Sequence, residues 1–428
     1  MLLALAFVLA IPQTPAAALT PPAECVKAAR DFTVKRQTEM RPLTADKVRQ
    51  IDVEKKEMAK ACAARIDVAS LNATGLVGMV ELYGETGEPD KATAALNAAL
   101  ARRDLAPADR GAALMQAVIS GLRSPRAPGR NEALEQLVDQ LDAIGPAAFE
   151  SQLNAHSRMN GEYRSDDIDA GIVKHSTWII NAAKTFTPAQ EQKFSTTVAS
   201  AHVNMAEAWA GQGMTDKALA LLREGSAKWG AFLPRANGPS LEEIYFDDEI
   251  ARLELVGMPA AALTAPAWFN KPANASELAM PGHVTLLEFT AHWCGPCRES
   301  YPGVNRLRAK YAPQGFRVAL ATRLYGYFGA EQNLAADAEI AKDKVYFQEH
   351  ELADVPVAIG GKIDIKVTNG KVEYIPAKDP NDVAYRVGGI PQIMLIDKKG
   401  KIRLIMVGYD DVNEPRLAKM IEDLLKEK

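Results

Sequence analysis

The stretch "HWCGPC", residues 292–297, holds the side chains best suited to chemistry, because two of the chain's four cysteines stand two residues apart there. Such a Cys-x-x-Cys pair is a redox couple, half of a metal site or a structural disulfide. A zinc site needs two further Cys or His ligands at suitable spacing. The other cysteines, Cys25 and Cys62, are distant in the sequence and histidines are few. We therefore expect a redox couple, with no metal site and no cofactor.

The flanking sequence predicts how the two sulfurs are positioned. The apolar run "VTLLEF" reads as a buried strand that ends shortly before Cys294, and a helix is predicted from Arg298 onward. Cys294 then lies at a helix N-terminus, where free N–H groups and the helix dipole stabilise a thiolate and lower its pKa. Cys297, one turn later, is expected to be more buried and to resolve the mixed disulfide. Pro296 lacks an N–H and suits the first turn.

The region around this pair predicts an α/β fold. Strand-like runs alternate with helical stretches at 298–311, 331–351 and 412–427, an order typical of α/β domains. The strand-like runs are "VTLLEF", "FRVALATRL", "VPVAI", "IDIKV", "KVEYI", "QIMLID" and "KIRLIMVG". Within this region Asn369-Gly370 predicts a β-hairpin at about 362–375, which either shapes substrate access or is decorative.

The N-terminal half has a different composition and predicts an all-α domain over residues 23–255. Two segments share an aromatic residue, a Gly-rich turn and an Asp-Lys-Ala start to the next helix, at Asp90 and Asp216. This pattern resembles the helix–turn–helix of tetratricopeptide repeats, although the spacing of the two segments is no multiple of the usual period of about 34. An irregular helical bundle is the alternative. Stacked helix pairs would offer a concave surface to a protein partner.

The beginning of the chain predicts export. An apolar run over residues 2–11 precedes Ala16-Ala17-Ala18, as in a signal peptide spanning residues 1–18, although a positive first segment is missing. A short N-terminal membrane anchor is the alternative. In an exported, periplasmic compartment disulfides persist. Cys25 and Cys62, about 37 positions apart, are therefore either a structural disulfide worth about 3–4 kcal/mol or two buried thiols. Because the net charge is −4, we expect no binding to nucleic acid.

Residues 256–428 resemble a known family. The segment "LLEFTAHWCGPCRESYP" and the later "YRVGGIPQIMLIDKKGKIRLIMVG" are similar to the thioredoxin superfamily, in particular its exported TlpA-like and ResA-like branch. The resemblance implies a thioredoxin fold in which Cys294 is the nucleophile and Cys297 the resolving thiol. It also implies that Glu288, six residues before Cys294, is a buried carboxylate that takes the proton from Cys297. The residues expected to contact substrate are Trp293, Gly295, Pro296, Ile390 and the cis-proline Pro391.

The direction of electron flow is predicted from the dipeptide between the cysteines. Gly295-Pro296 resembles reducing thioredoxins, whereas strong oxidants carry a histidine there. We therefore expect a reductase or isomerase that acts on protein thiols and disulfides and draws on an electron donor that the sequence does not identify. The alternatives are an oxidase that donates disulfides, and a binding scaffold whose thioredoxin domain is mainly structural. His292 is expected to be a solvated neighbour without a catalytic role.

Overall fold

The fold is seen in a computed structural model that describes residues 21–41, 44–233, 243–271, 282–362, 364–368, 371–375 and 379–427. The predicted signal peptide and the Asn369-Gly370 turn lie outside these residues. Contacts group the chain into two compact units, residues 1–156 and 157–428. This grouping places residues 157–255 in the same unit as the sheet. The domain boundary that the sequence indicates between residues 255 and 256 therefore stays a prediction.

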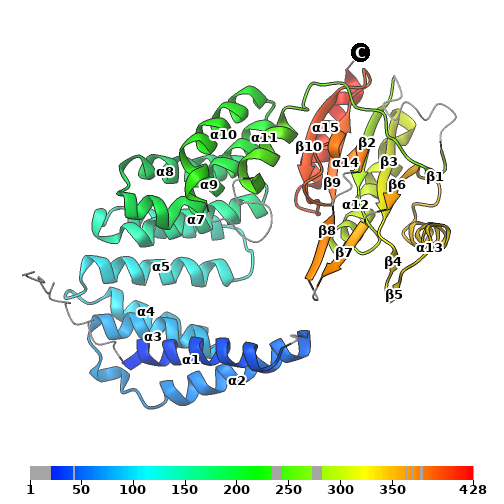
Figure 1. The fold of residues 1–428 in the computed structure, drawn as a ribbon. Coiled ribbons are helices and arrows are strands. Elements are labelled where there is room, and N and C mark those ends of the chain that lie inside the picture. The colour runs from blue at the N-terminus through cyan, green and yellow to red at the C-terminus, as the bar shows by residue number, and fades with distance from the viewer. Residues whose placement is uncertain are drawn as a thin grey trace, which may run out of the picture. The chain divides into compact units, whose positions relative to one another are not determined.

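The first unit is helical (Figure 1). Its helices are α1 (Pro21–Glu39), α2 (Ala45–Ala63), α3 (Ala73–Thr86), α4 (Pro89–Leu100), α5 (Pro107–Arg123) and α6 (Arg130–Asp142), and α7 (Phe149–Ser165) begins in it. Helices adjacent in the chain pack in pairs, α1 on α2, α3 on α4 and α5 on α6. A core of small and apolar side chains, among them Ala29, Met79, Leu82 and Ala95, lets these helices approach closely.

The second unit begins with further helices and continues into the sheet. The helices are α8 (Asp169–Ala182), α9 (Pro188–Gly211), α10 (Thr215–Trp229) and α11 (Asp248–Leu253), the last preceded by a π-helical turn at Glu243–Asp247. The Thr187 side chain caps α9 by accepting from the Gln190 backbone N–H, and Gln190 returns a bond to the Thr187 backbone. The all-α character predicted for this half of the chain is therefore seen in the residues described.

The two segments singled out by their shared sequence pattern also share local geometry. Gly87 and Gly213 follow α3 and α9 with φ of 74° and 79°, a left-handed conformation that glycine adopts without strain. Lys91 at the start of α4 lies 5.7 Å above the Tyr83 ring, and Lys217 at the start of α10 lies 3.6 Å above the Trp209 ring. The same helix–turn–helix unit is thus built twice, whereas a tetratricopeptide-like array stays a prediction.

Cys25 and Cys62 form a disulfide that ties α1 to α2, with Cα atoms 5.8 Å apart. We expect the double variant Cys25→Ala/Cys62→Ala to lose about 3–4 kcal/mol of unfolding free energy, because the bond closes a loop with a sequence separation of 37. All five tryptophans lie at residue 178 or later, so fluorescence does not report on this hairpin. Hydrogen exchange on peptides from residues 21–63 of the full chain is the measurement, and unchanged protection would contradict the prediction.

The sheet has six strands in the order β1-β6-β3-β2-β9-β10, as Figure 1 also shows. The strands are β1 (Ala267–Phe269), β2 (Val284–Phe289), β3 (Phe316–Leu324), β6 (Val357–Lys362), β9 (Gln392–Ile396) and β10 (Ile402–Val407). β2, β3 and β6 are parallel, whereas β9 pairs antiparallel with β2, β10 with β9 and β1 with β6. Two separate hairpins, β4 (Tyr327–Phe328) with β5 (Glu331–Gln332) and β7 (Asp364–Thr368) with β8 (Lys371–Ile375), complete the strands described.

Both faces of the central strand β2 are covered, which explains why "VTLLEF" is apolar without alternation. Val284 and Leu286 pack in one cluster with side chains of α12 (Gly295–Tyr311), α13 (Ala336–Glu349) and α15 (Glu414–Lys426). Leu287 and Phe289 pack on the opposite face, with Tyr385, which follows the short helix α14 (Pro380–Ala384). The α/β fold predicted for this region is confirmed.

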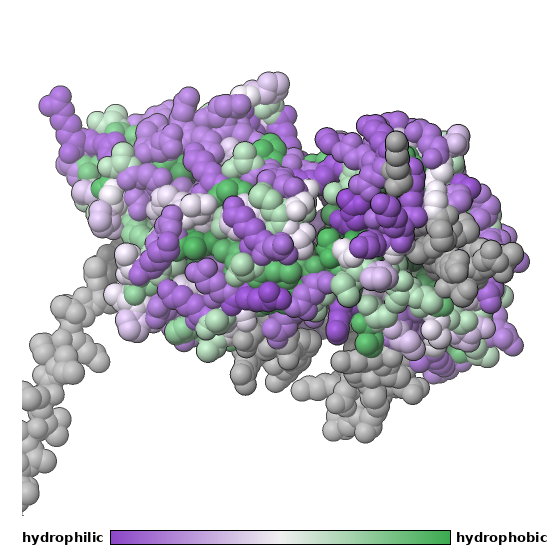
Figure 2. Space-filling view, turned by 90° about the horizontal axis from the view of Figure 1, so that it is seen from above, coloured by the Kyte–Doolittle hydropathy of each residue, from purple (hydrophilic) through white to green (hydrophobic). Residues whose placement is uncertain are grey.

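No helix in the described ranges combines the length and the apolar character that crossing a membrane requires. Hydrophilic side chains cover much of the face shown in Figure 2, with apolar side chains in smaller groups between them.

Candidate active site

Cys294 and Cys297 are joined by a disulfide at the start of α12, with Cα atoms 5.3 Å apart. Cys294 is the N-cap of this helix, and its sulfur accepts a hydrogen bond from the Cys297 backbone N–H at 3.1 Å. Pro296 lies in the first turn, where its missing N–H leaves no intrahelical bond unmade. Parallel strand β2 ends five residues earlier, so the pair lies beyond the carboxyl end of the sheet, where α/β sheets commonly place their sites.

The loop before β9 faces the same sulfur. The Ile390–Pro391 peptide bond is cis, and the Ile390 carbonyl oxygen lies 3.7 Å from Cys294 Sγ. A disulfide sulfur carries no hydrogen, so this approach is a van der Waals contact in the oxidised form. Pro391 is buried and its carbonyl accepts from the Gly408 N–H at 2.8 Å, which fixes the loop to the end of β10.

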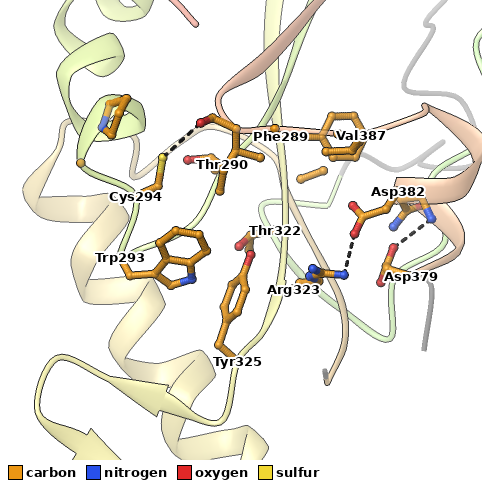
Figure 3. Close-up of a pocket in the computed structure, with 17 residues that line it drawn as sticks. Phe289, Thr290, Trp293, Cys294, Thr322, Arg323, Tyr325, Asp379, Asp382 and Val387 are labelled. Atoms are coloured by element: carbon orange, nitrogen blue, oxygen red, sulfur yellow. Dashed lines mark hydrogen bonds and ion pairs between the residues drawn. The ribbon is translucent and has the colours of Figure 1, made fainter. Parts of the chain in front are cut away.

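The two sulfurs differ in access to solvent. Cys297 is fully buried, while Cys294 is 3% exposed and lines a pocket of about 430 Å³. Gly295, Pro296 and Ile390 also line it. Trp293 is 47% exposed, and its ring stands edge-on to Tyr325 with centroids 5.4 Å apart. Figure 3 shows both rings on the side of the pocket where Cys294 lies.

The opposite wall of this pocket is charged. Arg323, near the carboxyl end of β3, forms an ion pair with Asp382 of α14 at 2.6 Å (Figure 3). Burial raises the pKa of the Asp382 carboxyl to about 6, although Arg323 acts to lower it. Sequence reasoning missed both residues. The one available signal is a charge near the C-terminal end of the apolar run "FRVALATRL", since that end of a parallel strand faces the site.

Glu288 lies in strand β2 and is fully buried. Its Oε1 lies 2.9 Å from Ser300 Oγ, and the Cys297 carbonyl oxygen lies 2.6 Å from the same hydroxyl, whose single hydrogen is shared between these two acceptors. No group in the described part of the chain bonds Glu288 Oε2. Burial raises the pKa of this carboxyl to about 8, and the Ser300 hydrogen bond lowers it only in part. One shared serine therefore links the predicted carboxylate to the backbone of Cys297.

The solvated position expected for His292 is wrong. The side chain is buried, with its Nδ1 3.2 Å from Asp343 Oδ1 and its ring stacked on Phe328 with centroids 4.7 Å apart. The β4–β5 hairpin and α13 cover the His292 side chain, and the sequence does not indicate that either element packs against it. Trp293, the next residue, is exposed instead, although both rings contact Tyr325.

Comparisons with known proteins were made for the whole chain. No protein-family model matches it, and no curated protein matches it. Among solved structures, one described as a thiol:disulfide interchange protein from Chlorobium tepidum is 28% identical, with 34% of this chain and 81% of that chain covered and a TM-score of 0.25. A thiol-disulfide isomerase from Corynebacterium glutamicum is 22% identical, with 40% and 97% covered and a TM-score of 0.30.

The fold of the region that contains the six-stranded sheet is identified from the features of that region. Three parallel strands continued by an antiparallel pair, a Cys-x-x-Cys pair at the N-terminus of the helix after β2, and a cis-proline before β9 together form a thioredoxin-like arrangement. Part of the chain therefore has the fold of the thioredoxin-like thiol–disulfide oxidoreductases.

Proposed function

We propose that this protein is a thiol–disulfide oxidoreductase that reduces or isomerises protein disulfides in an exported, periplasmic compartment. The observation that supports the proposal is the Cys294–Cys297 disulfide at a helix N-terminus. Cys294 lines a pocket, whereas Cys297 is fully buried. This difference in exposure suits a reaction in which Cys294 attacks the substrate disulfide and Cys297 resolves the mixed disulfide.

The reaction begins with the reduced dithiol. The Cys294 thiolate attacks one sulfur of a substrate disulfide, a mixed disulfide forms, and the first substrate thiolate leaves. Cys297 then gives up its proton and attacks Cys294 Sγ, which forms the Cys294–Cys297 disulfide and releases the second substrate thiolate. Two electrons pass to the substrate, and an electron donor must restore the dithiol afterwards.

The backbone around Cys294 supports these roles. The Cys297 N–H that reaches Cys294 Sγ would also stabilise negative charge on that sulfur. The Ile390 carbonyl lies beside the same sulfur at a cis-proline, where a substrate chain can pair with the loop as a short strand. Trp293, Gly295 and Pro296 would complete the contact surface, and Arg323 with Asp382 would present charge to the bound chain.

Glu288 is proposed as the acceptor of the Cys297 proton. Its carboxylate form increases as pH rises through about 8, so only a minority is ionised at neutral pH. We expect Glu288→Gln to slow the resolving step about 10- to 100-fold above pH 8, with a smaller difference below pH 7. Stopped-flow decay of a mixed disulfide formed on Cys294 measures this step, and Glu299→Gln, which changes an exposed carboxylate in α12 two residues after Cys297, is the matched control.

A second readout separates a chemical role from a structural one. Burial disfavours the ionised form of Glu288, so the stabilising effect of the neutral form is complete below its ordinary pKa of 4.5 and is lost as pH rises through about 8. In the oxidised protein, the unfolding free energy of the wild type should therefore fall relative to that of Glu288→Gln over this range. Equal pH dependence in both proteins would show that the carboxyl does not titrate in this way.

The direction of electron flow is tested by the reduction potential of the full-length protein. Equilibration with thiol–disulfide buffers, followed by mass-resolved alkylation, should give a value between about −180 and −270 mV for the Cys294/Cys297 couple. This expectation follows from Gly295-Pro296, which places no positive side chain between the sulfurs. A value near about −120 mV would instead establish a disulfide-donating oxidase.

A further inference from the structure

A second group of chemically capable side chains lies next to the disulfide but plays no part in the proposed exchange. His292, Glu339 and Asp343 each offer one ligand atom, and these atoms all lie within 4.8 Å of one another. The residues are 6%, 0% and 1% exposed. Glu339 and Asp343 stand four residues apart on α13 and so share one face of that helix, while His292 comes from the segment after β2.

The protein itself leaves most of these polar atoms without hydrogen bonds. Among the described residues, no group is hydrogen-bonded to either ring nitrogen of His292 or to either carboxylate oxygen of Asp343. His292 Nδ1 and Asp343 Oδ1 are 3.2 Å apart, which is close enough for an ion pair but without the alignment of a hydrogen bond. Buried polar groups in native proteins almost always have a partner, because an unpaired group loses its hydrogen bonds to water without replacement.

Glu339 is held in place by the backbone. Its Oε1 accepts the Tyr325 N–H at 2.6 Å and its Oε2 accepts the Gly326 N–H at 2.7 Å, so both oxygens are oriented by the turn after β3. A carboxylate oxygen has two lone pairs, and each of these oxygens retains one for a further partner. Ligands that are oriented in advance by a second layer of hydrogen bonds are typical of metal sites.

The surroundings favour a cation. Two carboxylates are buried together, and the rings of Tyr325, Tyr327 and Phe328 cover His292, with centroids 5.7, 5.4 and 4.7 Å from its own. Lys342, the neighbour of Asp343 in the sequence, pairs with Glu331 at 2.7 Å instead. A divalent ion would balance the two negative charges and provide a partner for the free ligand atoms of both His292 and Asp343.

We propose that His292, Glu339 and Asp343 bind one divalent transition-metal ion of the zinc type. One imidazole nitrogen and two carboxylates form a mixed nitrogen–oxygen donor set, which suits zinc and its first-row neighbours better than the all-oxygen ions calcium and magnesium. The ion would tie α13 to the segment that carries Trp293 and Cys294. The expectation of no metal came from the distant cysteines and the few histidines, whereas this site uses one histidine and two carboxylates.

Zinc binding to the full-length oxidised protein tests the site, because all four cysteines are then in disulfides and provide no thiolate. After treatment with a chelator, titration with Zn²⁺ against a chromogenic competitor should show one ion per chain with a micromolar or tighter Kd. Because removal of an outer-layer partner alone weakens metal sites about 10- to 100-fold, Asp343→Asn and His292→Gln should each raise Kd by about 100-fold or more.

The matched controls are Asp337→Asn, an exposed carboxylate on the same helix, and His283→Gln, another histidine of this domain; both should bind as the wild type does. X-ray absorption at the zinc edge of the wild type gives a second readout that needs no variant, with one imidazole nitrogen, oxygen ligands and no sulfur expected. Absence of zinc binding, equal affinity in Asp343→Asn, or a spectrum without imidazole would each overturn the proposal. None of these results depends on thiol–disulfide exchange.

Discussion

Replacing Cys294 with serine is expected to reduce the turnover of protein disulfides by at least about 1000-fold, because a serine hydroxyl cannot take the place of the thiolate that attacks the substrate. The sulfur lost is the one that lines the pocket and lies 3.7 Å from the Ile390 carbonyl. Reduction of insulin by dithiothreitol, followed by turbidity, measures the effect in the full-length protein.

The appropriate control is a variant that lacks the N-terminal disulfide. The Cys25→Ala/Cys62→Ala variant leaves the Cys294–Cys297 pair intact and should retain the wild-type rate. If Cys294→Ser reduced insulin as fast as the wild type, the thioredoxin-like part would be structural, and the reading of the chain as a binding scaffold would be favoured.

Replacing Cys297 with serine is expected to stop the reaction at the mixed disulfide between Cys294 and the substrate. Cys294 can still attack a substrate disulfide, but no second thiol within α12 can release the adduct, so the mixed disulfide accumulates instead of decaying within a turnover. Non-reducing electrophoresis after mixing the reduced variant with a peptide disulfide should show one adduct per chain, and peptide mapping should place it on Cys294.

The same variant identifies partners. Adducts captured from an extract of exported proteins would name the substrates and the electron donor, which residue patterns alone do not reveal. An adduct found on Cys25 or Cys62 would contradict the assignment of Cys294 as the nucleophile, because Cys25 and Cys62 form a disulfide that ties α1 to α2. Failure of Cys297→Ser to form any adduct, while Cys294→Ser does form one, would reverse the roles of the two sulfurs.

The parts of the site that follow one another along the chain could be predicted well. The strand 284–289, the helix that begins just after Cys294 and the proline at 391 are encoded by runs of adjacent residues whose meaning does not depend on distant segments. The burial of Glu288 also followed from its apolar neighbours, because the whole of β2 lies between two covered faces.

The parts that depend on tertiary pairing could not be predicted. β1 lies in a Pro- and Ala-rich segment that reads as a linker, and three residues form a strand there because they pair with β6. Arg323 and Asp382 are far apart in the chain and meet only because the carboxyl end of β3 and helix α14 border one pocket. His292 is buried by a hairpin and a helix that come more than thirty residues later, and this burial creates the proposed metal site.

The most direct test is the stoichiometry of a single exchange. The full-length protein, reduced selectively at Cys294 and Cys297, is mixed with one equivalent of a peptide disulfide in the absence of other reductants, then quenched by alkylation and mapped by mass spectrometry. We predict that one peptide disulfide is reduced per chain while both thiols at 294 and 297 disappear and the Cys25–Cys62 bond is unchanged. Reduction of the peptide without loss of these two thiols, or no reduction at all, would contradict the account.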